Sequence, residues 1–345
     1  MNHWDLLVWS IRRWTVSNYN DAPELLRLSI ARRADLLARL VRENTDMVRL
    51  LHGTTEGAPG LAIDRYGGHL LLQTWRGPLD LGLIAELRTV ANEMLDTRLT
   101  AVWNHRVRPI DFGKWFTVEG SGPNVGTEAG IRFDARLRHR GQDPLLFLDF
   151  RVARAAVRAH ADGKRVLNSF SYTGGVGVAA AVGGATAVWQ LDFARSAQDV
   201  AKTNAALNNL TTPMRYLQEN AITAMRQMAG LSLGRARRIP DLGREQFDLV
   251  ILDPPRFSKS RTGAVDLVRD YQSLFKPALL CTAEGGRMLV ANNVAQVDRA
   301  AWVSDLSRCA EKAGRPIREI ELLAPDDDFP SFDGKPPLKV ALLSV

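Results

Sequence analysis

The sequence predicts an α/β protein whose larger, second part is a doubly wound, mostly parallel sheet with helices on both faces. From residue 143 onward, apolar runs typical of buried strands alternate with stretches of helical periodicity. The strand-like runs cover residues 165–167, 187–191, 247–252 and 287–291. The helical stretches cover residues 176–182, 196–208, 271–281 and 300–313. Two final runs, 317–323 and 339–344, have no helix between them and predict an antiparallel hairpin added to the sheet.

Two smaller segments precede this domain. Short β-type runs separated by turns occur at residues 47–51, 61–64, 69–75, 101–104, 115–119 and 131–137, with one helical stretch at 81–95. They predict a small α+β domain over residues 46–142, whose first three runs form a hairpin or meander and not a βαβ unit. Residues 1–45 are typical of a basic helical segment in two pieces, broken by Asn18, Asn20 and Pro23. The third domain is then residues 143–345.

The chain carries a formal net charge of +7, and its first segment is rich in arginine. Such an excess suits a polyanionic partner such as RNA, but it also occurs in proteins that bind no nucleic acid. The arginines of this segment are Arg12, Arg13, Arg27, Arg32, Arg33, Arg39 and Arg42. They form either a phosphate-binding face or a solvated helix face, and the pattern leaves both readings open.

The remaining composition excludes several kinds of site. The two cysteines, Cys281 and Cys309, are too few for a disulfide framework, and the six histidines are scattered, so no metal site is expected. The first thirty residues contain no apolar run long enough for a signal peptide or a membrane span. We therefore expect a cytoplasmic protein without a membrane partner, either a monomer or a homodimer.

Ligands of an open parallel sheet bind beyond the carboxyl ends of its strands, so these ends are the places to search for a site. The first strand leads into a glycine-rich turn that opens a helix, with Gly174 and Gly175 at its centre. Glycines let the backbone pass close to a ligand, and the free amides at a helix start favour a carboxylate. The second strand ends at Asp192, 18 positions after Gly174, where a carboxylate can accept hydrogen bonds from ribose hydroxyls.

The strand at residues 247–252 ends in Asp253, Pro254, Pro255, Arg256 and Phe257. Two prolines directly after a buried strand fix a rigid turn at the edge of the cleft. Such a turn presents backbone carbonyls and an aromatic ring in a defined place. A plain strand terminator would explain the two prolines, but not the acid before them or the ring after them.

These motifs resemble those of bacterial 23S rRNA methyltransferases, in the group that holds both cytosine-C5 and guanine-N7 enzymes. The resemblance rests on residues 147–151 and 170–175, on Asp192 and on residues 247–257. It begins near Val48, because residues 51–53 and 60–66 are similar to the small α+β domain that precedes the catalytic domain in that group. It implies a class I, Rossmann-like domain that uses S-adenosylmethionine.

The resemblance also implies a role for individual positions. The methionine end of the cofactor would lie against Ser171, Tyr172, Thr173, Gly174 and Gly175. Its ribose would lie at Asp192 and Phe193, and Phe147, Asp149 and Arg151 would close the site from the other side. The target base would face Asp253, Pro254 and Pro255.

One position departs from the family pattern. The family usually has an acidic residue for the adenine amino group, where this chain has Glu219 and Asn220. Asn220 can accept the hydrogen bond through its amide oxygen without bringing a charge, and Glu219 is the alternative acceptor. The adenine contacts are therefore the least defined part of the cofactor site.

The chemistry is narrowed by the residues at the end of the strand at 287–291. Methylation of a pyrimidine at C5 normally requires a cysteine thiolate beside the cofactor, and the cytosine-type relatives carry one after this strand. Here Asn292 and Asn293 hold that place, while Cys281 and Cys309 fall in the flanking helices. Methyl transfer to a ring nitrogen needs no covalent step. The amides of Asn292 and Asn293 would then contact the base edge and Phe257 would stack on the base.

The leading prediction is thus a methyltransferase that acts on structured RNA, most simply large-subunit rRNA at a guanine ring nitrogen. Three alternatives remain open. They are a cytosine-C5 enzyme, a methyltransferase for a small molecule or a protein, and an RNA-binding relative without catalysis.

Overall fold

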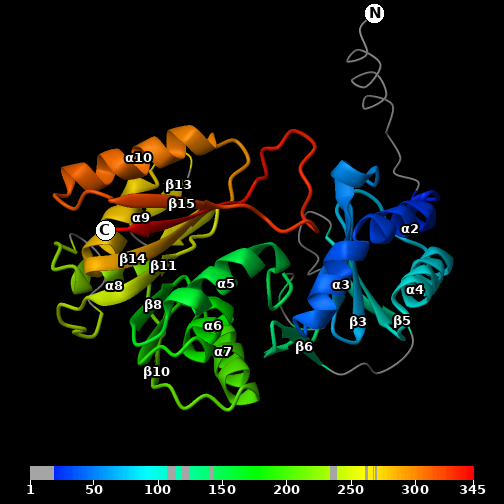
Figure 1. The fold of residues 1–345 in the computed structure, drawn as a ribbon, viewed down its shortest axis with the longest axis horizontal. Helices are drawn as coiled ribbons and strands as arrows, with labels where there is room; N and C mark the ends of the chain where they lie inside the picture. The colour runs from blue at the N-terminus through cyan, green and yellow to red at the C-terminus, as the bar shows by residue number, and fades with distance from the viewer. Residues whose placement is uncertain are drawn as a thin grey trace, which may run out of the picture. The chain divides into compact units, whose positions relative to one another are not determined.

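The computed structural model describes residues 19–106, 114–118, 124–137, 139, 141, 143–233, 239–260, 263–266, 268 and 270–345. For residues 114–118, 257–260 and 263–266 it describes the backbone alone. The chain forms two compact units (Figure 1). The first is built from Met1–Gly130, Ala135–Leu148 and Asp327–Phe332, and the second from Ile131–Asp134, Asp149–Asp326 and Asp333–Val345.

The sheet of the first unit has the order β1-β2-β3-β4-β5. Its strands are β1 (Met47–His52), β2 (Leu61–Tyr66), β3 (His69–Thr74), β4 (Thr100–His105) and β5 (Lys114–Val118). The first three strands form the predicted antiparallel meander, whereas β4 runs parallel to β3. The helix α4 (Leu81–Leu95) makes this crossover, so the unit combines a meander with one βαβ connection.

Two further helices pack on this sheet within the same unit. They are α2 (Ala22–Arg32) and α3 (Ala34–Arg42), and η1 (Gly53–Glu56) follows β1. The predicted break agrees with the structure on its C-terminal side, because Asn20 precedes α2 and Pro23 lies in its first turn, where a missing backbone N–H costs nothing. A further boundary, which was not predicted, separates α2 from α3 at Arg33. The predicted breaker Asn18 lies outside the described residues.

Arg33 is buried and forms an ion pair with Glu56, with side chains that are 3% and 6% exposed. Its guanidinium donates two hydrogen bonds to the Glu56 carboxylate, at 2.7 and 2.8 Å, and also contacts Ser29. A bidentate pair of this kind satisfies both charges away from water. Arg33 is therefore a structural residue of the first unit and not part of a phosphate-binding face.

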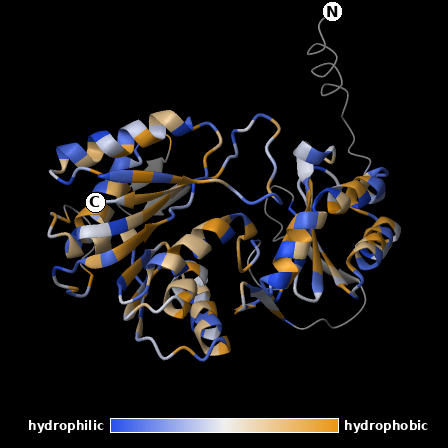
Figure 2. Cartoon of the chain, viewed as in Figure 1, coloured by the Kyte–Doolittle hydropathy of each residue, from blue (hydrophilic) through white to orange (hydrophobic). Residues whose placement is uncertain are grey.

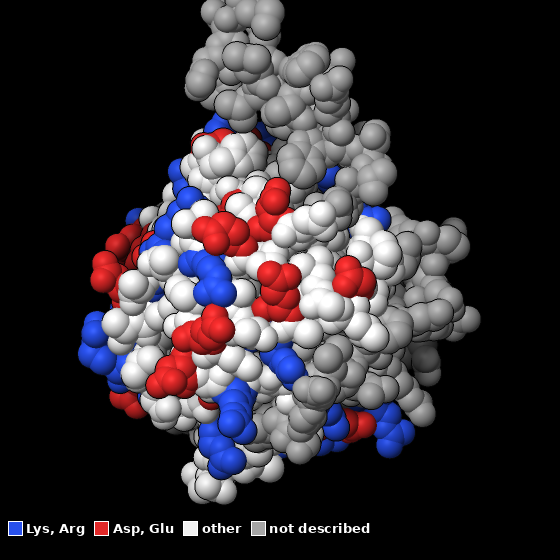
Figure 3. Space-filling view, turned by 90° about the vertical axis from the view of Figure 1, so that its right-hand side faces the viewer, with Lys and Arg blue, Asp and Glu red and all other residues white. Residues whose placement is uncertain are grey.

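Other arginines of the predicted basic face also have acidic partners. Arg27 pairs with Glu93 and Arg39 with Glu43. Figure 3, in which the right-hand side of Figure 1 faces the viewer, shows Lys and Arg interspersed with Asp and Glu. Arg12 and Arg13 lie outside the described residues. The described part of this segment thus presents mixed charge to solvent.

The second unit contains a seven-stranded sheet with the order β10-β9-β8-β11-β14-β16-β15. Its strands are β8 (Arg165–Ser169), β9 (Ala187–Leu191), β10 (Met214–Leu217), β11 (Phe247–Leu252), β14 (Thr282–Asn292), β15 (Glu319–Leu323) and β16 (Lys339–Ser344). The strands β8 to β11 and β14 are parallel, and β15 and β16 add the predicted antiparallel hairpin. The predicted α/β fold is confirmed.

Helices cover this sheet on both faces (Figure 1). They are α5 (Arg151–His160), α6 (Gly175–Val182), α7 (Arg195–Leu207), α8 (Ala221–Met228), α9 (Gln272–Leu280) and α10 (Arg299–Lys312). The shorter elements are β6 (Val125–Glu128), β7 (Ile131–Asp134), η2 (Leu148–Phe150) and the paired β12 (Phe257–Ser260) and β13 (Gly263–Asp266). The sheet strands are largely hydrophobic in Figure 2, as expected for strands covered on both faces. Among the described residues no helix has the length and apolar character to cross a membrane.

Removing the carboxylate of Glu56 tests the structural role of Arg33. Glu56→Ala leaves a buried guanidinium without its counter-charge, which typically costs about 3–5 kcal/mol. Native-state hydrogen exchange of the β1 and β2 amides should therefore accelerate strongly. The matched variant Glu93→Ala breaks the exposed pair with Arg27 and should cost less than about 1 kcal/mol. Equal effects of the two variants would contradict a structural role for Arg33.

Candidate functional site

Five strand ends of the second sheet lie in one row. The register pairs Ser169 with both Leu191 and Leu252, and pairs Leu252 with Val290 and Leu191 with Leu217. The residues that follow therefore emerge at the same carboxyl edge. Successive strands are added on one side of β8 as far as β10 and on its other side from β11 onward, so the boundary between β8 and β11 is the switch point where ligands of such sheets bind. The two predicted motifs, the glycine-rich turn and Asp253, leave the two strands that flank this point.

The turn after β8 holds an unusual backbone conformation. Phe170 and Tyr172 have positive φ angles of 55° and 47°, and Gly174 has a φ of 74°. Left-handed backbone at bulky residues is rare and marks functional loops. A Cβ added at Gly174 would lie 2.6 Å from the Ala201 Cβ, so this position requires glycine for space as well as for conformation.

Two buried amides fix this turn to the sheet. The Asn168 amide donates to the Gln190 side-chain oxygen at 2.8 Å, and the Gln190 amide donates to the Gly174 carbonyl at 3.2 Å. Both side chains are at most 2% exposed. A Cβ at Gly177 would meet the Gln190 Nε2 at 2.2 Å, so Gly177 makes room for this amide. The hydrogen bonds connect β8, β9 and the start of α6.

Asp192 connects the turns after β8 and β9. Its carboxylate accepts hydrogen bonds from the Tyr172 amide at 2.9 Å and from the Ala194 amide at 2.8 Å. Each carboxylate oxygen has a second lone pair, which leaves Asp192 able to accept from a ribose. Phe193, the next residue, is 70% exposed. An apolar ring beside an acceptor carboxylate fits a nucleoside.

The side chain of Ser171 is a buried polar group of this turn. Its hydroxyl is buried without a hydrogen-bond partner within the described residues. The neighbouring Thr173 carbonyl accepts from the Asn204 amide of α7 at 2.9 Å. A buried hydroxyl without a partner is costly, and a polar ligand in the turn would satisfy it. The turn therefore fits the polar methionine end of S-adenosylmethionine.

Asp253 is half-buried at the end of β11 and has two charged neighbours, Asp149 and Arg154. Burial and the Asp149 carboxylate raise the pKa of Asp253 to about 7, against the opposing effect of Arg154. Asp149 belongs to η2, and Arg154 lies on the first turns of α5. Arg151, three positions before Arg154, forms an ion pair with Asp326 at 2.9 Å. Carboxylates with a pKa near neutrality are typical of functional sites.

The remaining predicted residues of the base and cofactor sites differ in burial and location. Pro254 is buried and Pro255 is exposed. Phe257 opens β12, and its side chain lies outside the described part. Phe147 belongs to the first unit and is 45% exposed.

Asn292 ends β14 with a buried side chain that is 1% exposed. Its amide oxygen accepts from the Val294 amide at 3.0 Å, while its amide nitrogen has no partner within the described residues. Its cross-strand neighbour is Lys339, whose ammonium donates to the Val294 carbonyl at 2.8 Å. Within the described part of the chain, the Asn292 amide nitrogen is thus a buried donor without an acceptor.

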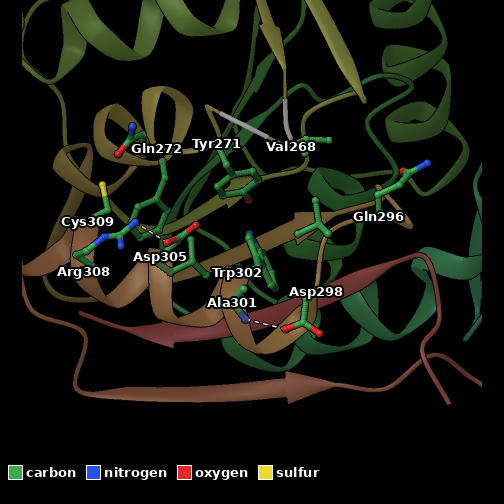
Figure 4. Close-up of a pocket in the computed structure, with 13 residues that line it drawn as sticks. Val268, Tyr271, Gln272, Gln296, Asp298, Ala301, Trp302, Asp305, Arg308 and Cys309 are labelled. Carbon is green, nitrogen blue, oxygen red and sulfur yellow. Dashed lines mark hydrogen bonds and ion pairs between the residues drawn. The ribbon is translucent and has the colours of Figure 1, made fainter.

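Tyr271 supports the same strand end. Its hydroxyl donates to the Ala291 carbonyl at 2.9 Å, and burial together with the nearby Asp253 carboxylate raises its pKa. The ring also lines a hollow of about 260 Å³ between α9 and α10 (Figure 4). There it packs edge to face against the Trp302 ring, with the two ring centroids 5.8 Å apart. Tyr271 therefore couples the floor of this hollow to the end of β14.

Both cysteines are unsuited to nucleophilic attack. Cys281 is the C-cap of α9 and is fully buried, which raises the pKa of its thiol to about 12. Its sulfur donates to the Met225 carbonyl at 3.3 Å. Cys309 lies on α10, where burial also raises the pKa of the thiol. Neither thiol is held as a thiolate.

At the expected adenine position, Asn220 is the N-cap of α8. Its amide oxygen accepts from the Thr223 amide at 3.0 Å and from the Thr223 hydroxyl at 3.2 Å. The oxygen expected to accept from adenine is therefore engaged in capping the helix. Glu219, which is half-buried, is the better acceptor of the two.

Sequence reasoning missed Arg154, Tyr271 and Asp326. Arg154 had a signal, because an i,i+3 spacing places it on the same helix face as Arg151. Asp326 and Tyr271 had none, since their partners are distant along the chain. The described residues contain no cluster of His, Cys, Asp or Glu able to hold a metal ion.

Substitution of Gly174 tests the close approach in the turn. Gly174→Ala should weaken S-adenosylmethionine binding by about tenfold or more, or about 1.4 kcal/mol, because the new methyl group displaces the turn from α7. Gly163→Ala is the matched control, since Gly163 has a φ of 69° but nothing within 4 Å of an added Cβ. Titration calorimetry should show wild-type affinity for the control. Equal losses in both variants would assign the effect to backbone strain alone.

The raised pKa of Asp253 predicts a pH-dependent stability. An unfolded Asp titrates near about 3.9, so between about pH 4 and pH 7 the folded state binds more protons and loses stability as the pH rises. Asp253→Asn removes the group that causes this pH dependence of the stability. The variant should match the wild type near pH 4 and become progressively more resistant to urea than the wild type up to about pH 7. Parallel urea midpoints across this range would refute the pKa assignment.

Comparisons with known proteins agree with this geometry. The family model described as S-adenosylmethionine-dependent methyltransferase matches residues 49–344. The ribosomal RNA large subunit methyltransferase I of Erwinia tasmaniensis is 28% identical over 301 residues, which cover 86% of this chain and 73% of that protein. The protein of the same name from Shigella boydii is 28% identical over 298 residues, or 84% and 71% of the two chains. The resemblance inferred from the motifs is therefore confirmed.

Solved structures give the same fold. A methyltransferase solved in complex with SAH has a TM-score of 0.76 at 22% identity, covering 94% of this chain and 80% of that one. A methyltransferase from Streptococcus mutans has a TM-score of 0.76 at 21% identity, covering 96% and 83%. With the family model spanning most of the sequence and a strand-end site that suits the cofactor, this chain belongs to the S-adenosylmethionine-dependent methyltransferase family.

Proposed function

We propose that this enzyme methylates large-subunit rRNA at a guanine ring nitrogen, without a covalent intermediate on the enzyme. The rRNA substrate is supported by the names of the relatives from Erwinia tasmaniensis and Shigella boydii. The formal charge of +7 is compatible with a polyanionic partner. A guanine ring nitrogen is supported by the residues at the ends of β11 and β14.

The turn after β8 is the proposed site for the methionine end of the cofactor. It would be surrounded by Ser171, Tyr172, Thr173, Gly174 and Gly175, with the Ser171 hydroxyl as a donor that has no partner among the described residues. Asp192 and Phe193 would hold the ribose and the adenine face, and Glu219 would accept from the adenine amino group in preference to Asn220. Asp149 and Arg151 would form the opposite wall. When bound, S-adenosylmethionine supplies an electrophilic methyl group on its sulfonium.

The state of the thiols is the observation that carries the choice of acceptor. Attack on C6 of a cytosine requires a thiolate beside the base. Both thiols have raised pKa values, and Cys281 is completely buried at a helix end. The end of β14 instead contains the Asn292 amide nitrogen, a buried donor that has no acceptor among the described residues. This group can donate to a carbonyl on the edge of a guanine.

Asp253, Pro254 and Pro255 would position the base from the other side of the switch point. A ring nitrogen attacks through its own lone pair, so the enzyme has to hold it in line with the methyl group and exclude water. An ionised Asp253 can accept hydrogen bonds from the N–H groups of guanine, and its pKa of about 7 also allows a protonated, donating form. Phe257 would stack on the splayed base, as aromatic side chains do in such enzymes.

Mass-spectrometric mapping of modified nucleotides tests this proposal. A strain that lacks the gene should lose one methylguanine from its large-subunit rRNA, and the wild-type gene should restore it. The Asp192→Ala gene should restore little, because the variant binds S-adenosylmethionine weakly. Loss of a methylcytosine would favour the cytosine-C5 alternative, and unchanged rRNA would leave a small molecule or a protein as the substrate. Absence of any binding of the cofactor would indicate a relative without catalysis.

A further inference from the structure

The first unit carries a partly exposed group of aromatic and basic side chains at one end of its sheet. Because β3 and β4 run parallel, with Thr74 opposite His105, their carboxyl ends lie side by side. Trp75 and Arg76 follow β3, and Arg106 follows β4. Trp75, Arg76, His105 and Arg106 are here called the Trp75 cluster. Each of its members lies at or directly after the end of a strand that is paired within the sheet.

Trp75 is the aromatic centre of the cluster and is 47% exposed. Its backbone amide donates to the Gly60 carbonyl at 2.9 Å. The Arg106 guanidinium lies over its ring, 5.6 Å from the ring centroid. A half-exposed indole offers a large apolar face on which a ligand ring can stack. The ring is thus held in place with a cation beside it.

Arg76 is positioned by a glycine. A Cβ added at Gly60 would lie 2.7 Å from the Arg76 Cγ and 3.0 Å from its Cδ. The aliphatic stem of Arg76 therefore lies directly on Gly60, where any larger residue would displace it. Gly60 also has a φ of 86°, which favours glycine. The arginine side chain leaves this contact with its charged end exposed to solvent.

Buried Thr74 organises the inner side of the cluster. Its hydroxyl accepts a hydrogen bond from the Trp103 indole at 3.0 Å and shares another with His105 Nδ1 at 2.8 Å. Its carbonyl accepts from the Arg106 amide at 2.8 Å. His105 also stacks on Trp103 with the centroids 5.4 Å apart. Hydrogen bonds to Thr74 therefore hold His105 and the backbone of Arg106 in place.

Arg106 has a counter-ion that an anionic ligand can replace. Its guanidinium pairs with Asp143 at 2.6 Å, and the Asp143 side chain is 50% exposed. Surface ion pairs of this kind contribute little to stability. A phosphate is a stronger bidentate acceptor for arginine than one solvated carboxylate.

We propose that the Trp75 cluster binds a single-stranded segment of the RNA substrate, with a base stacked on Trp75 and the flanking phosphates at Arg76 and Arg106. The proposal rests on the proposed RNA substrate and specifies where the first unit contacts it. A flat aromatic ring flanked by arginines suits alternating bases and phosphates, which an acidic peptide does not offer.

Fluorescence anisotropy with a short labelled oligoadenylate tests the stacking contact in the full-length protein. Trp75→Ala should weaken binding by about fivefold to a hundredfold, the usual range for one base–aromatic stack, whereas Trp75→Phe should retain most of the affinity. Phe332→Ala is the matched control, because Phe332 is 80% exposed in the same unit and should bind as the wild type does. Near-UV circular dichroism verifies that each variant is folded.

The arginine contact has its own readout. The logarithm of the affinity falls linearly with the logarithm of the salt concentration. Arg76→Gln should make this slope less steep by about 0.7, the value for one phosphate contact on a single strand. Arg98→Gln is the control, since Arg98 is exposed just before β4, at the opposite end of the same strand. Asp143→Asn should tighten binding, because it removes the competing carboxylate from Arg106.

The outcomes separate this proposal from the proposed function. Unchanged affinity of Trp75→Ala, or no binding of oligoadenylate by the wild type, would overturn the Trp75 cluster as an RNA site. Methylation of protein-free large-subunit rRNA by the same wild-type protein would show that the proposed function stands regardless. A folded Trp75→Ala variant with weakened oligoadenylate binding and an unchanged KM for S-adenosylmethionine would support the cluster.

Discussion

The buried amides of Asn168 and Gln190 are the constraint on which the candidate site depends. Each lies inside the second unit, where an amide without a hydrogen bond costs about 1–3 kcal/mol. They satisfy each other and the Gly174 carbonyl, and so they hold the turn after β8 against the end of β9. Gly177 is required for the same reason, because its missing Cβ leaves room for Gln190. The position of the turn is thus a consequence of polar satisfaction in the core.

The same constraint explains why strained backbone persists at the edge of the sheet. Phe170 and Tyr172 both occupy the left-handed region. This backbone conformation costs free energy, so it persists only where surrounding contacts stabilise it. Asp192 provides one of these contacts by accepting from the Tyr172 amide. The turn is therefore preorganised, and a ligand need not supply the energy of ordering it. Among the described residues, the Ser171 hydroxyl and the Asn292 amide nitrogen of this edge are buried without a hydrogen-bond partner.

Much of the fold could be predicted from the sequence because the strands of the second sheet are short, apolar and separated by helical periodicity. The predicted bounds of β9, β11 and β16 agree with the structure. The strand β10 was missed, since its residues Met214–Leu217 form an edge that is mostly half-exposed or exposed and lacks an apolar run. The parallel pairing of β3 with β4 was missed as well, because direction depends on a crossover that periodicity does not report.

The site was predictable to a smaller extent. Strand-end motifs predicted that Gly174, Asp192, Asp253 and Asn292 lie at the carboxyl edge of the sheet, where the structure has them, because this placement depends on local sequence. The environment of Asp253 was not predictable, because Arg154 and Tyr271 approach it from distant elements. The helix-capping role of Asn220 could have been inferred from Thr223 three positions later, a spacing that favours an N-cap. Arg33 was open to a charge-based misreading, since net charge does not distinguish a buried pair from an exposed face.

The central claim is that the edge between β8, β11 and β14 transfers a methyl group without an enzyme-bound covalent intermediate. Its most direct test uses large-subunit rRNA in which cytidine is replaced by 5-fluorocytidine, which traps the cysteine adduct of C5 methylation. After incubation with enzyme and S-adenosylmethionine, denaturing electrophoresis should show no protein–RNA adduct, while labelled methyl groups appear on guanine. A stable adduct that disappears with Cys281→Ala or Cys309→Ala would contradict the claim.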